Sequence, residues 1–509
     1  MKVANRIIFN TGVLYFKIVV TTLISLVSVP LVLKAMGESD YGTYTLVGGV
    51  IALLAFLKSS MVVSTQRFLS VTLGEGKIMQ LNLVFNTSLV LHLLIGIILI
   101  LMLELCTPLL FGGILNIPEE RLSAARLIYH FMVLTTFMDI ISVPFMGVIN
   151  AKEDMFVFSL IGIAEALLKF FVAIYIGYWG ADRLVFYGAG ILLISLFSMT
   201  CNLCFVRYRY KEFVISFIRY FDKNTFRDLL EFTVWNTFGA IAIVGRNQGV
   251  AVIMNLFYGT IVNAAYGIAN QINGVLGYFS VTFQKSLNPQ LMKSKGMENE
   301  DRLRYLSYVS SKYSTLAMAM LAVPLIMEME YVLDFWLGNA PQYTLQFCRL
   351  VIIMSILTQF SSGLMSAISA SGRIKNYQIV ISVFIILNVP LSYLMLKYGL
   401  PPYFCIIGFI SIELLSFCVR LYMSHKLVGI CPFEFLSDVV RPTLICIILP
   451  AAVVYPLLLL MDASFVRLVL LTGVYILTFA ILVWTVALHD NERMIFVEMK
   501  NKVLKYINL

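Results

Sequence analysis

Charged side chains stand inside long apolar runs of this sequence, and they are the residues best placed to do chemistry. Away from the ends of the runs there are five bases and three acids: Lys17, Lys58, Asp139, Glu165, Lys169, Arg246, Lys312 and Glu413. A charge at the centre of a lipid-facing helix costs about 2.5–3.5 kcal/mol. These side chains must therefore pair with one another, reach the membrane surface or face water.

Local spacing accounts for three of the eight. Glu165 and Lys169 are four residues apart with the acid first, which favours an ion pair on one helix face and a structural role. Lys312 lies about seven residues from the cytoplasmic end of its run, roughly 10 Å along a helix, so its long side chain is expected to snorkel to the interface.

The remaining cations, Lys17, Lys58 and Arg246, are candidates for an anion site. Lys17 and Lys58 lie roughly 10–12 Å above the inner boundary of their runs, and Arg246 lies near the middle of its own. A guanidinium can hold phosphate oxygens in a fork, and a lysine supplies a point charge. The alternative interpretation is intramembrane pairing with Asp139 or Glu413.

Other chemistries find no support in the sequence. It contains no GxxxxGK[ST] loop for nucleotide phosphates, no HExxH, no GxSxG and no DxD motif, so no catalytic or metal site is predicted. The formal net charge of +9 does not indicate nucleic acid, because the basic residues fall in alternate short loops between apolar runs. We expect a chain that is not an enzyme and has no resident cofactor.

The elements that carry these charges are membrane spans. The chain of 509 residues is 60% apolar and 13% charged, which is typical of an all-α polytopic membrane protein. The first run lacks a cleavage signal and is predicted to be an uncleaved span. Fourteen runs of about 20 residues could cross a bilayer: 10–33, 44–65, 82–103, 125–149, 156–177, 184–206, 232–257, 261–284, 305–327, 346–370, 377–397, 401–421, 441–461 and 465–487.

The basic residues concentrate in the even-numbered connections and the two termini, which places both termini in the cytoplasm. The most charged connection, 207–231, has Phe213, Phe217, Ile218 and Phe221 at helical spacing and predicts an interfacial amphipathic helix. The outward loops are short, and Glu328 and Glu330 in one of them are expected to be solvated.

A weak internal repeat relates the first six spans to the next six. The matches are Asn10-Thr11 with Asn236-Thr237, Tyr41-Gly42 with Tyr266-Gly267, Gln66-Arg67 with Gln284-Lys285, Gly180 with Gly399, and Gly188 with Gly408. Their offsets run from 218 to 226 residues. The repeat predicts two parallel six-helix lobes with a central cavity, and two extra helices after them.

The predicted domain organisation follows from the spans and the repeat. It comprises an N-terminal lobe at 1–206, the amphipathic connector at 207–231, a C-terminal lobe at 232–423, a cytoplasmic loop at 424–440, two extra transmembrane helices at 441–487 and a cytoplasmic tail at 488–509.

The N-terminal motifs resemble a known family. Asn10-Thr11, Pro30, Gly37, Tyr41-Gly42-Thr43-Tyr44 and Gln66-Arg67-Phe68 are similar to the polysaccharide-transport branch, the Wzx-type flippases, of the multidrug/oligosaccharidyl-lipid/polysaccharide (MOP) exporter superfamily. The resemblance covers essentially the whole chain. It implies a MATE-like fold and the flipping of undecaprenyl-pyrophosphate-linked sugar units across the bacterial cytoplasmic (inner) membrane.

The resemblance also implies a site. In related flippases, basic residues on the first, second and seventh or eighth spans line a cationic cavity, and Lys17, Lys58 and Arg246 match that description by span. Two of these positions carry lysine where the family usually has arginine. The expected mechanism is alternating access, with Asp139 and Glu413 as candidate carriers of a coupling H⁺ or Na⁺.

The implied partners are a lipid-linked anionic oligosaccharide, membrane lipids and other polysaccharide-assembly membrane proteins, with no nucleic acid. Two alternatives remain open. A MATE-type exporter of small organic molecules would need an acidic cavity for cations, and a membrane-embedded polymerase or glycosyltransferase would need a large outward loop or a metal-binding carboxylate motif.

Overall fold

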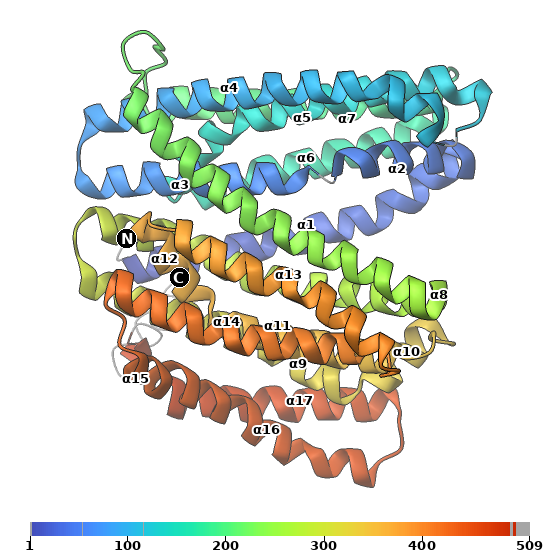
Figure 1. Cartoon of the computed structure of the whole chain (residues 1–509), viewed down its shortest axis with the longest axis vertical. Coiled ribbons are helices and arrows are strands. Elements are labelled where there is room, and N and C mark those ends of the chain that lie inside the picture. Colours follow the sequence, from blue (N-terminus) through green and yellow to red (C-terminus); the bar gives the residue numbers. More distant parts are fainter. Residues whose placement is uncertain (1–2, 53, 116, 489–491, 495–509) are drawn as a thin grey trace, which may run out of the picture. The chain divides into compact units, whose positions relative to one another are not determined.

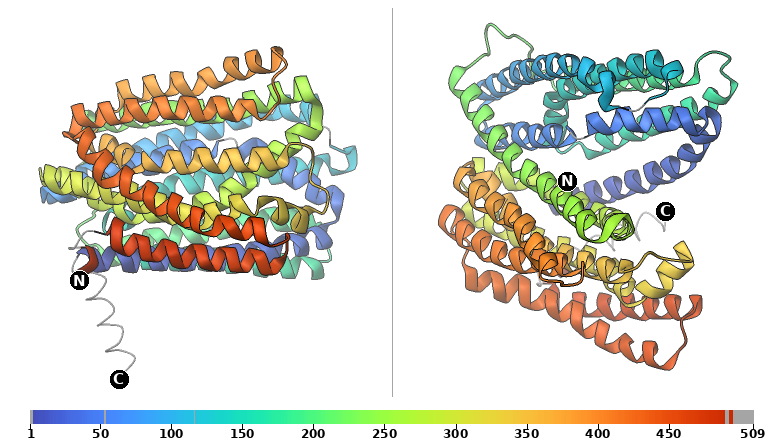
Figure 2. Two further views of the ribbon diagram at one scale, coloured as in Figure 1. Left: turned by 90° about the horizontal axis from the view of Figure 1, so that it is seen from below. Right: turned by 45° about the vertical axis from the view of Figure 1, so that its right-hand side comes forward.

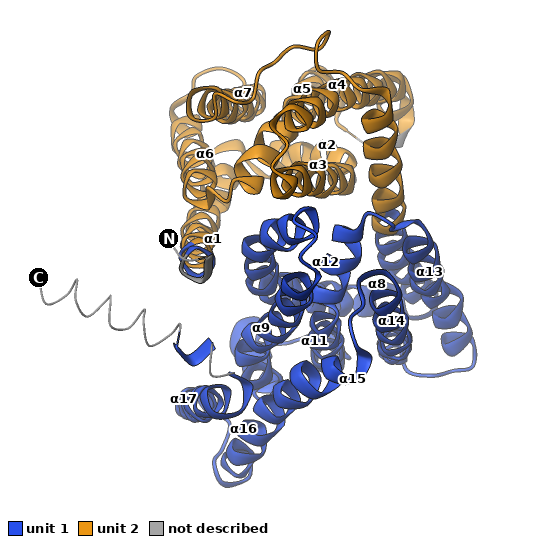
Figure 3. Cartoon of the chain, turned by 90° about the vertical axis from the view of Figure 1, so that its left-hand side faces the viewer, with its two compact units in different colours: residues 1–9, 241–509 blue, residues 10–240 orange. Residues whose placement is uncertain are grey.

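The structure is a computed structural model that describes residues 3–52, 54–115, 117–488 and 492–494. These residues form helices and connecting turns, with no strand among them, which confirms the all-α prediction. The chain folds into two compact units, which Figure 3 colours separately. The N-terminal unit is Asn10–Ala240, and the C-terminal unit is Ile241–Leu509 together with Met1–Phe9.

The N-terminal unit is a helical bundle with α5 at its centre. Its elements are α1 (Val3–Met36), α2 (Glu38–Ala52), α3 (Ala55–Glu75), α4 (Ile78–Leu109), η1 (Leu110–Ile114), η2 (Glu119–Arg121), α5 (Leu122–Ala151), α6 (Met155–Tyr175), η3 (Ile176–Tyr178) and α7 (Arg183–Arg209). Helix α5 packs against α3, α4 and α7, as Figure 1 shows. Its Tyr129 is fully buried and donates to the carbonyl of Leu103 on α4 at 2.7 Å.

Most of the C-terminal unit is built around α9. Its elements are α8 (Lys223–Gly296, which begins in the N-terminal unit), α9 (Glu300–Met327), α10 (Met329–Leu337), α11 (Thr344–Phe360), α12 (Ser362–Ser371), α13 (Lys375–Lys397), α14 (Phe404–Val428), α15 (Pro432–Phe435), η4 (Leu436–Val440), α16 (Arg441–Leu460), α17 (Phe465–Leu482) and η5 (Val483–Ala487). Helices α16 and α17 pair with each other and with α9, and Figure 2 shows them as neighbours.

Among the described glycines of the C-terminal unit, Gly363 lies closest to a neighbouring helix. Gly363 on α12 lies against α9 so tightly that a Cβ there would be 1.8 Å from the carbonyl oxygen of Ser307. The Gly363 N–H donates to Ser311 Oγ at 3.0 Å, and Ser362 Oγ donates to the carbonyl of Ser310 at 3.3 Å. The small hydroxyl side chains of α9 therefore bring two helix backbones together, as is common inside membranes.

The number of spans agrees with the sequence. Within the described ranges, eleven helices are long and apolar enough to cross a membrane, or thirteen when the bent pairs α2/α3 and α11/α12 each count as one span. Helix α8 has 74 residues, but Gly259 breaks it with φ 75° and ψ −166°, so α8 supplies two spans rather than one. The total becomes the predicted fourteen, and the chain is a multi-pass membrane protein.

Replacing Gly259 by alanine should destabilise the protein by about 1–3 kcal/mol, because only glycine adopts its backbone conformation without strain. No atom crowds this position, so the effect would come from the backbone alone. Thermal unfolding of the purified protein in detergent measures it. Gly267→Ala, at an uncrowded helical position, is the control and should not lower the melting temperature. If Gly259→Ala and wild type had the same melting temperature, the strained backbone conformation assigned to position 259 would be contradicted.

The connector is not the predicted amphipathic helix. Helix α7 ends at Arg209, α8 begins at Lys223, and no helix is assigned to residues 210–222 between them. Two asparagines on α4 explain the difference, because they bind the connector backbone as a neighbouring strand would. Asn82 donates to the carbonyl of Glu212 at 2.7 Å and accepts from the N–H of Val214 at 2.9 Å.

One turn further along α4, Asn86 repeats the arrangement. It donates to the carbonyl of Val214 at 2.8 Å and accepts from the N–H of Ser216 at 2.8 Å. The connector thus obtains backbone hydrogen bonds without coiling, which removes the main reason for it to become a helix. Its apolar residues do not share one face as the pattern predicted, because Phe213 is buried while Phe217, Ile218 and Phe221 are exposed.

Two buried ion pairs attach the extra helices to the rest of the C-terminal unit, and both correct an expectation. Lys312 does not snorkel: it is 2% exposed and its Nζ lies 2.8 Å from Glu492, beyond η5. Glu328 is not solvated but 1% exposed, and Arg467 of α17 holds both its oxygens at 2.8 Å. Both pairs join residues more than 130 positions apart. Most of the predicted tail, 488–509, lies outside the described residues.

Candidate functional site

In the N-terminal unit, Lys58 and Asp139 form one ion pair. Lys58 Nζ on α3 lies 2.6 Å from Asp139 Oδ2 on α5, and Ser195 Oγ on α7 donates to Asp139 Oδ1 at 3.2 Å. The side chains of the pair are 37% and 41% exposed, so it stands at an accessible border of the bundle. The sequence assigned an anion-binding role to one residue and an ion-coupling role to the other. The structure places the two residues in one ion pair, whose charges cancel.

A second group of charges lies along α6. Lys17 of α1 places its Nζ 4.0 Å from the ring centre of Phe158. Its side chain also fills the space above Gly162, where a Cβ would lie 2.4 Å from Lys17 Cε. Glu165 and Lys169 form the ion pair expected from their spacing, at 2.7 Å. Because positions 158, 162, 165 and 169 share one helix face, this face carries two positive charges and one negative charge.

In the C-terminal unit, Arg246 has an amide rather than a carboxylate as its hydrogen-bond partner. Its Nε and Nη2 donate to Asn247 Oδ1 at 3.1 and 3.0 Å. Its guanidinium lies 5.0 Å from the ring centre of Phe409 on α14. Within the described part of the chain, Arg246 forms no ion pair, and its Nη1 donates no hydrogen bond.

Glu413, one turn after Phe409, already has a cation. Its Oε1 lies 2.5 Å from Arg420 Nη1 on the same helix, and Arg420 also donates to Ser361 Oγ at 3.2 Å. The side chains of Glu413 and Arg420 are 13% and 5% exposed. Sequence reasoning missed Arg420, which it placed at the end of a span. The separation of seven residues, two helical turns, was the signal that could have found it.

The structure therefore keeps the predicted residues in three groups. Lys58 joins Asp139, Lys17 lies near Glu165 and Lys169 on α6, and Arg246 lies beside Glu413 without bonding to it. Of the predicted cavity cations, Lys58 is paired with Asp139, whereas Arg246 has no carboxylate partner among the described residues and its Nη1 donates no hydrogen bond there. The roles of all seven residues stay predictions.

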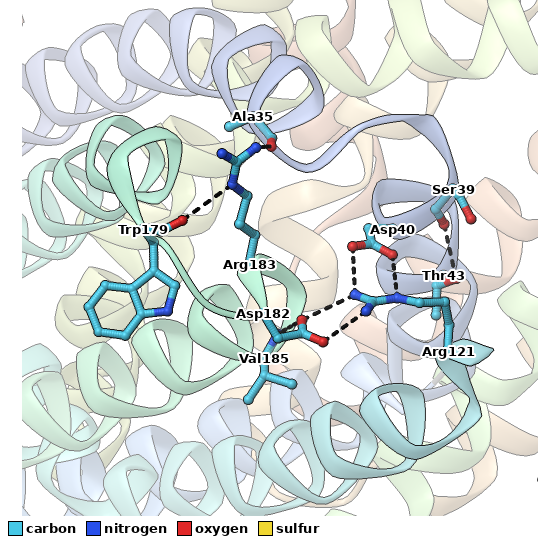
Figure 4. Close-up of polar contacts among 9 residues, drawn as sticks. All are labelled: Ala35, Ser39, Asp40, Thr43, Arg121, Trp179, Asp182, Arg183 and Val185. Carbon is cyan, nitrogen blue, oxygen red and sulfur yellow. Dashed lines mark hydrogen bonds and ion pairs between the residues drawn. The ribbon is translucent and has the colours of Figure 1, made fainter.

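Sequence reasoning also missed a network at the predicted outward end of the N-terminal unit, shown in Figure 4. Arg121 holds Asp40 of α2 through Nε and Nη2 at 2.7 and 2.6 Å. It also holds Asp182, the N-cap of α7, through Nη1 and Nη2 at 2.8 and 3.1 Å. Arg183 donates to the carbonyl of Ala35 at the end of α1 at 2.7 Å. These contacts fasten the ends of α1, α2, α5 and α7 together.

This network should loosen in acid. Burial raises the pKa of Asp182, but hydrogen bonds from Arg121 and from the Val185 N–H outweigh burial and leave that pKa below its ordinary value of 3.8. A carboxyl with a lowered folded-state pKa stabilises the fold above its ordinary pKa, and this contribution is lost as pH falls through the lowered value. The melting temperature of wild type should fall more steeply below about pH 4 than that of Asp182→Asn. Parallel slopes would contradict the role of Asp182.

Comparison with known proteins gives the fold. No protein-family model and no curated protein matches the chain. A MATE structure in the bent conformation matches with a TM-score of 0.74 and 14% identity, covering 84% of this chain and 96% of that one. An outward-facing multidrug-resistance MATE transporter of the MOP superfamily matches with a TM-score of 0.72 and 14% identity, covering 84% and 96%.

A third solved structure is a MOP superfamily transporter from Pyrococcus furiosus, described as having a binding pocket of reversed polarity. It matches with a TM-score of 0.72 and 14% identity, covering 83% of this chain and 95% of that one. At such identities the likeness shows the fold alone. The chain has the MATE-like fold of MOP superfamily transporters, as the sequence predicted. The polysaccharide-transport branch is a finer assignment that stays a prediction.

Proposed function

We propose that this protein is a flippase that moves undecaprenyl-pyrophosphate-linked oligosaccharide across the bacterial cytoplasmic membrane. The oligosaccharide would be a repeat unit of O-antigen, capsule or exopolysaccharide. Both termini lie in the cytoplasm in this proposal, and the membrane-bound proteins that make and polymerise the repeat unit are natural partners. The protein carries its substrate and does not alter it chemically.

The observation that supports this proposal best is the environment of Arg246. A cation within a membrane span is normally paired with a carboxylate, since an unpaired charge in a membrane is costly. Arg246 instead has Asn247 and Phe409 as neighbours, while Glu413 is held by Arg420. An anionic substrate group such as pyrophosphate would supply the missing charge, and the guanidinium fork suits its oxygens.

The energy source is also a proposal. Asp139 and Glu413 are the candidate H⁺ or Na⁺ carriers, and each is ion-paired, with Lys58 and Arg420 respectively. An ion that binds either carboxylate must displace the base, so ion binding would free a positive charge. In that way a coupling ion and an anionic substrate could favour each other.

The test uses purified protein in liposomes that contain a fluorescent undecaprenyl-pyrophosphate-linked oligosaccharide. Leaflet transfer is read from the fraction of fluorescence quenched by an impermeant reductant, with and without a proton or sodium gradient. We expect transfer above that of empty liposomes. Transfer equal to the empty-liposome rate under every gradient would overturn the proposal.

A MATE-type exporter of small organic molecules is the second candidate, and the multidrug-resistance transporter among the matched structures favours it. An exporter of organic cations would need acids in its site that are not neutralised. Asp139 and Glu413 are both paired with bases, which counts against this function. Efflux of a cationic dye from cells that express the protein, driven by a sodium or proton gradient, would support the exporter instead.

A further inference from the structure

Membrane-spanning helices normally expose apolar side chains, because hydrocarbon offers no hydrogen-bond partner. Helices α16 and α17 follow this rule. Their exposed side chains include Leu449, Val453 and Leu459 on α16, and Val469 and Leu477 on α17. These helices define what a lipid-facing surface looks like in this protein.

The second half of α8, residues 260–296, exposes apolar residues such as Ile261, Val275 and Val281, but it exposes polar residues among them. It exposes Asn270, Gln271, Tyr278 and Lys285 on its surface, and Tyr278 is 61% exposed. Gln271, Tyr278 and Lys285 follow one another at intervals of seven residues, so they lie on one helix face over about 21 Å. We call Gln271, Tyr278 and Lys285 the α8 polar face. Such a surface is unsuited to hydrocarbon and suited to water or a polar ligand.

Three other amides of this helix have partners on α11 and α12. Asn273 is hydrogen-bonded by Ser355 of α11, Gln284 donates to Gln359 of α11 at 3.0 Å, and Asn288 accepts from Ser366 of α12 at 2.9 Å. By contrast, no described residue hydrogen-bonds to or pairs with the side chains of Gln271 or Lys285. The helix thus has one face satisfied by its own unit and one that offers its polar groups outward.

The equivalent span of the N-terminal unit shares this polar exposure at one position only. Tyr41-Gly42 and Gln66-Arg67 of α2 and α3 correspond to Tyr266-Gly267 and Gln284-Lys285 of α8 in the sequence repeat. Helices α2 and α3 expose Thr45 and Ser59. Thr45 lies 225 residues before Asn270, just as Tyr41 lies 225 residues before Tyr266. The hydroxyl of Thr45 donates to its own helix backbone, and Leu46, which has the same offset from Gln271, is 41% exposed, so the outward amide of Gln271 is particular to α8.

We propose that the α8 polar face binds the glycan part of the substrate. The amide of Gln271 offers donors and an acceptor, which match a pair of sugar hydroxyls. The exposed ring of Tyr278 can lie against the apolar face of a sugar ring, and Lys285 can hold an acidic group at one end. The positive end also disfavours an organic cation. This inference rests on the proposed function and deepens it.

The test compares two forms of one substrate: the lipid-linked glycan extracted from the bacterium that carries this protein, either intact or trimmed enzymatically to undecaprenyl-pyrophosphoryl monosaccharide. Gln271→Leu and Tyr278→Ala are compared with Val469→Ala, a control at an exposed apolar position on α17. We expect each α8 variant to slow transfer of the intact glycan about fivefold to tenfold, as for one lost hydrogen bond or stacking contact, and to leave the trimmed form unchanged.

Equal slowing of both forms, or no slowing of either, would overturn the inference while the flippase function stands. If wild type transfers neither form, the proposed function falls. The α8 polar face is then tested by equilibrium dialysis of the free repeat-unit oligosaccharide against the purified protein. Binding that Gln271→Leu weakens supports a sugar-binding face, and absence of binding by wild type overturns it.

Discussion

Arg246→Ala should lower leaflet transfer of the lipid-linked oligosaccharide by about a hundredfold, because two charge-assisted hydrogen bonds of about 1.5 kcal/mol each would be lost. The ring of Phe409 covers the guanidinium at 5.0 Å and keeps water from that side, which strengthens a bond to an anion. Arg246→Lys should restore part of the activity, since lysine keeps the charge but cannot form the fork. The proteoliposome assay measures all three proteins.

Arg373→Ala is the matched control for losing one positive charge, because Arg373 is exposed in a turn of the same unit. It should transfer at the wild-type rate. Membrane abundance and melting temperature are measured in parallel, so that misfolding of Arg246→Ala is not mistaken for lost binding. Wild-type transfer by a folded Arg246→Ala protein would contradict the anion-binding role. For an exporter of cations, the same change should leave efflux intact or raise it.

Among alanine substitutions at the described glycines of the C-terminal unit, Gly363→Ala should destabilise the protein most. The new Cβ would be 1.8 Å from the carbonyl oxygen of Ser307, which belongs to the backbone of α9 and cannot rotate away. Helices α9 and α12 would have to separate, and the bond from the Gly363 N–H to Ser311 would lengthen or break. Overpacking of about 1–3 kcal/mol and a lost buried hydrogen bond of about 1 kcal/mol predict a cost near 3 kcal/mol or more.

Thermal unfolding in detergent measures this cost, with Gly473→Ala on α17 as the control. Gly473 has open space at its Cβ position, so alanine there should be neutral or should stabilise its helix by up to about 1 kcal/mol. If Gly363→Ala had the same melting temperature as wild type, α12 would not lie as close to α9 as described. Ser307→Gly should not rescue the variant, because the clash is with a backbone atom.

The sequence predicted what depends on local pattern. Apolar runs of membrane length gave the spans, and the boundary between runs 232–257 and 261–284 fell where Gly259 breaks α8. The spacing of Glu165 and Lys169 gave an ion pair that the structure contains. In each case the information lies within a few residues, where helix geometry alone decides which side chains meet.

What the sequence did not predict depends on partners far along the chain. Lys312 looked able to reach the interface, but Glu492, 180 residues later, meets it inside the protein. Lys58 meets Asp139 across 81 residues, a choice that no periodicity encodes. Three predicted cations and two acids allow several pairings, and only packing selects among them. The same reason explains why Arg420, the cation that holds Glu413, was overlooked.

The asparagine contacts to the connector bear on how its sequence can change over time. Asn82 and Asn86 bind backbone carbonyl and N–H groups, and every residue except proline supplies both. These hydrogen bonds therefore do not depend on which side chains stand at positions 212, 214 and 216. Apart from Phe213, which is buried and packs against Phe85 of α4, mutations that alter charge or bulk in the connector can therefore accumulate without releasing it from α4. Selection should act on the two asparagines, on Phe213 and against proline at positions 214 and 216, leaving the exposed positions of the connector to diverge among descendants.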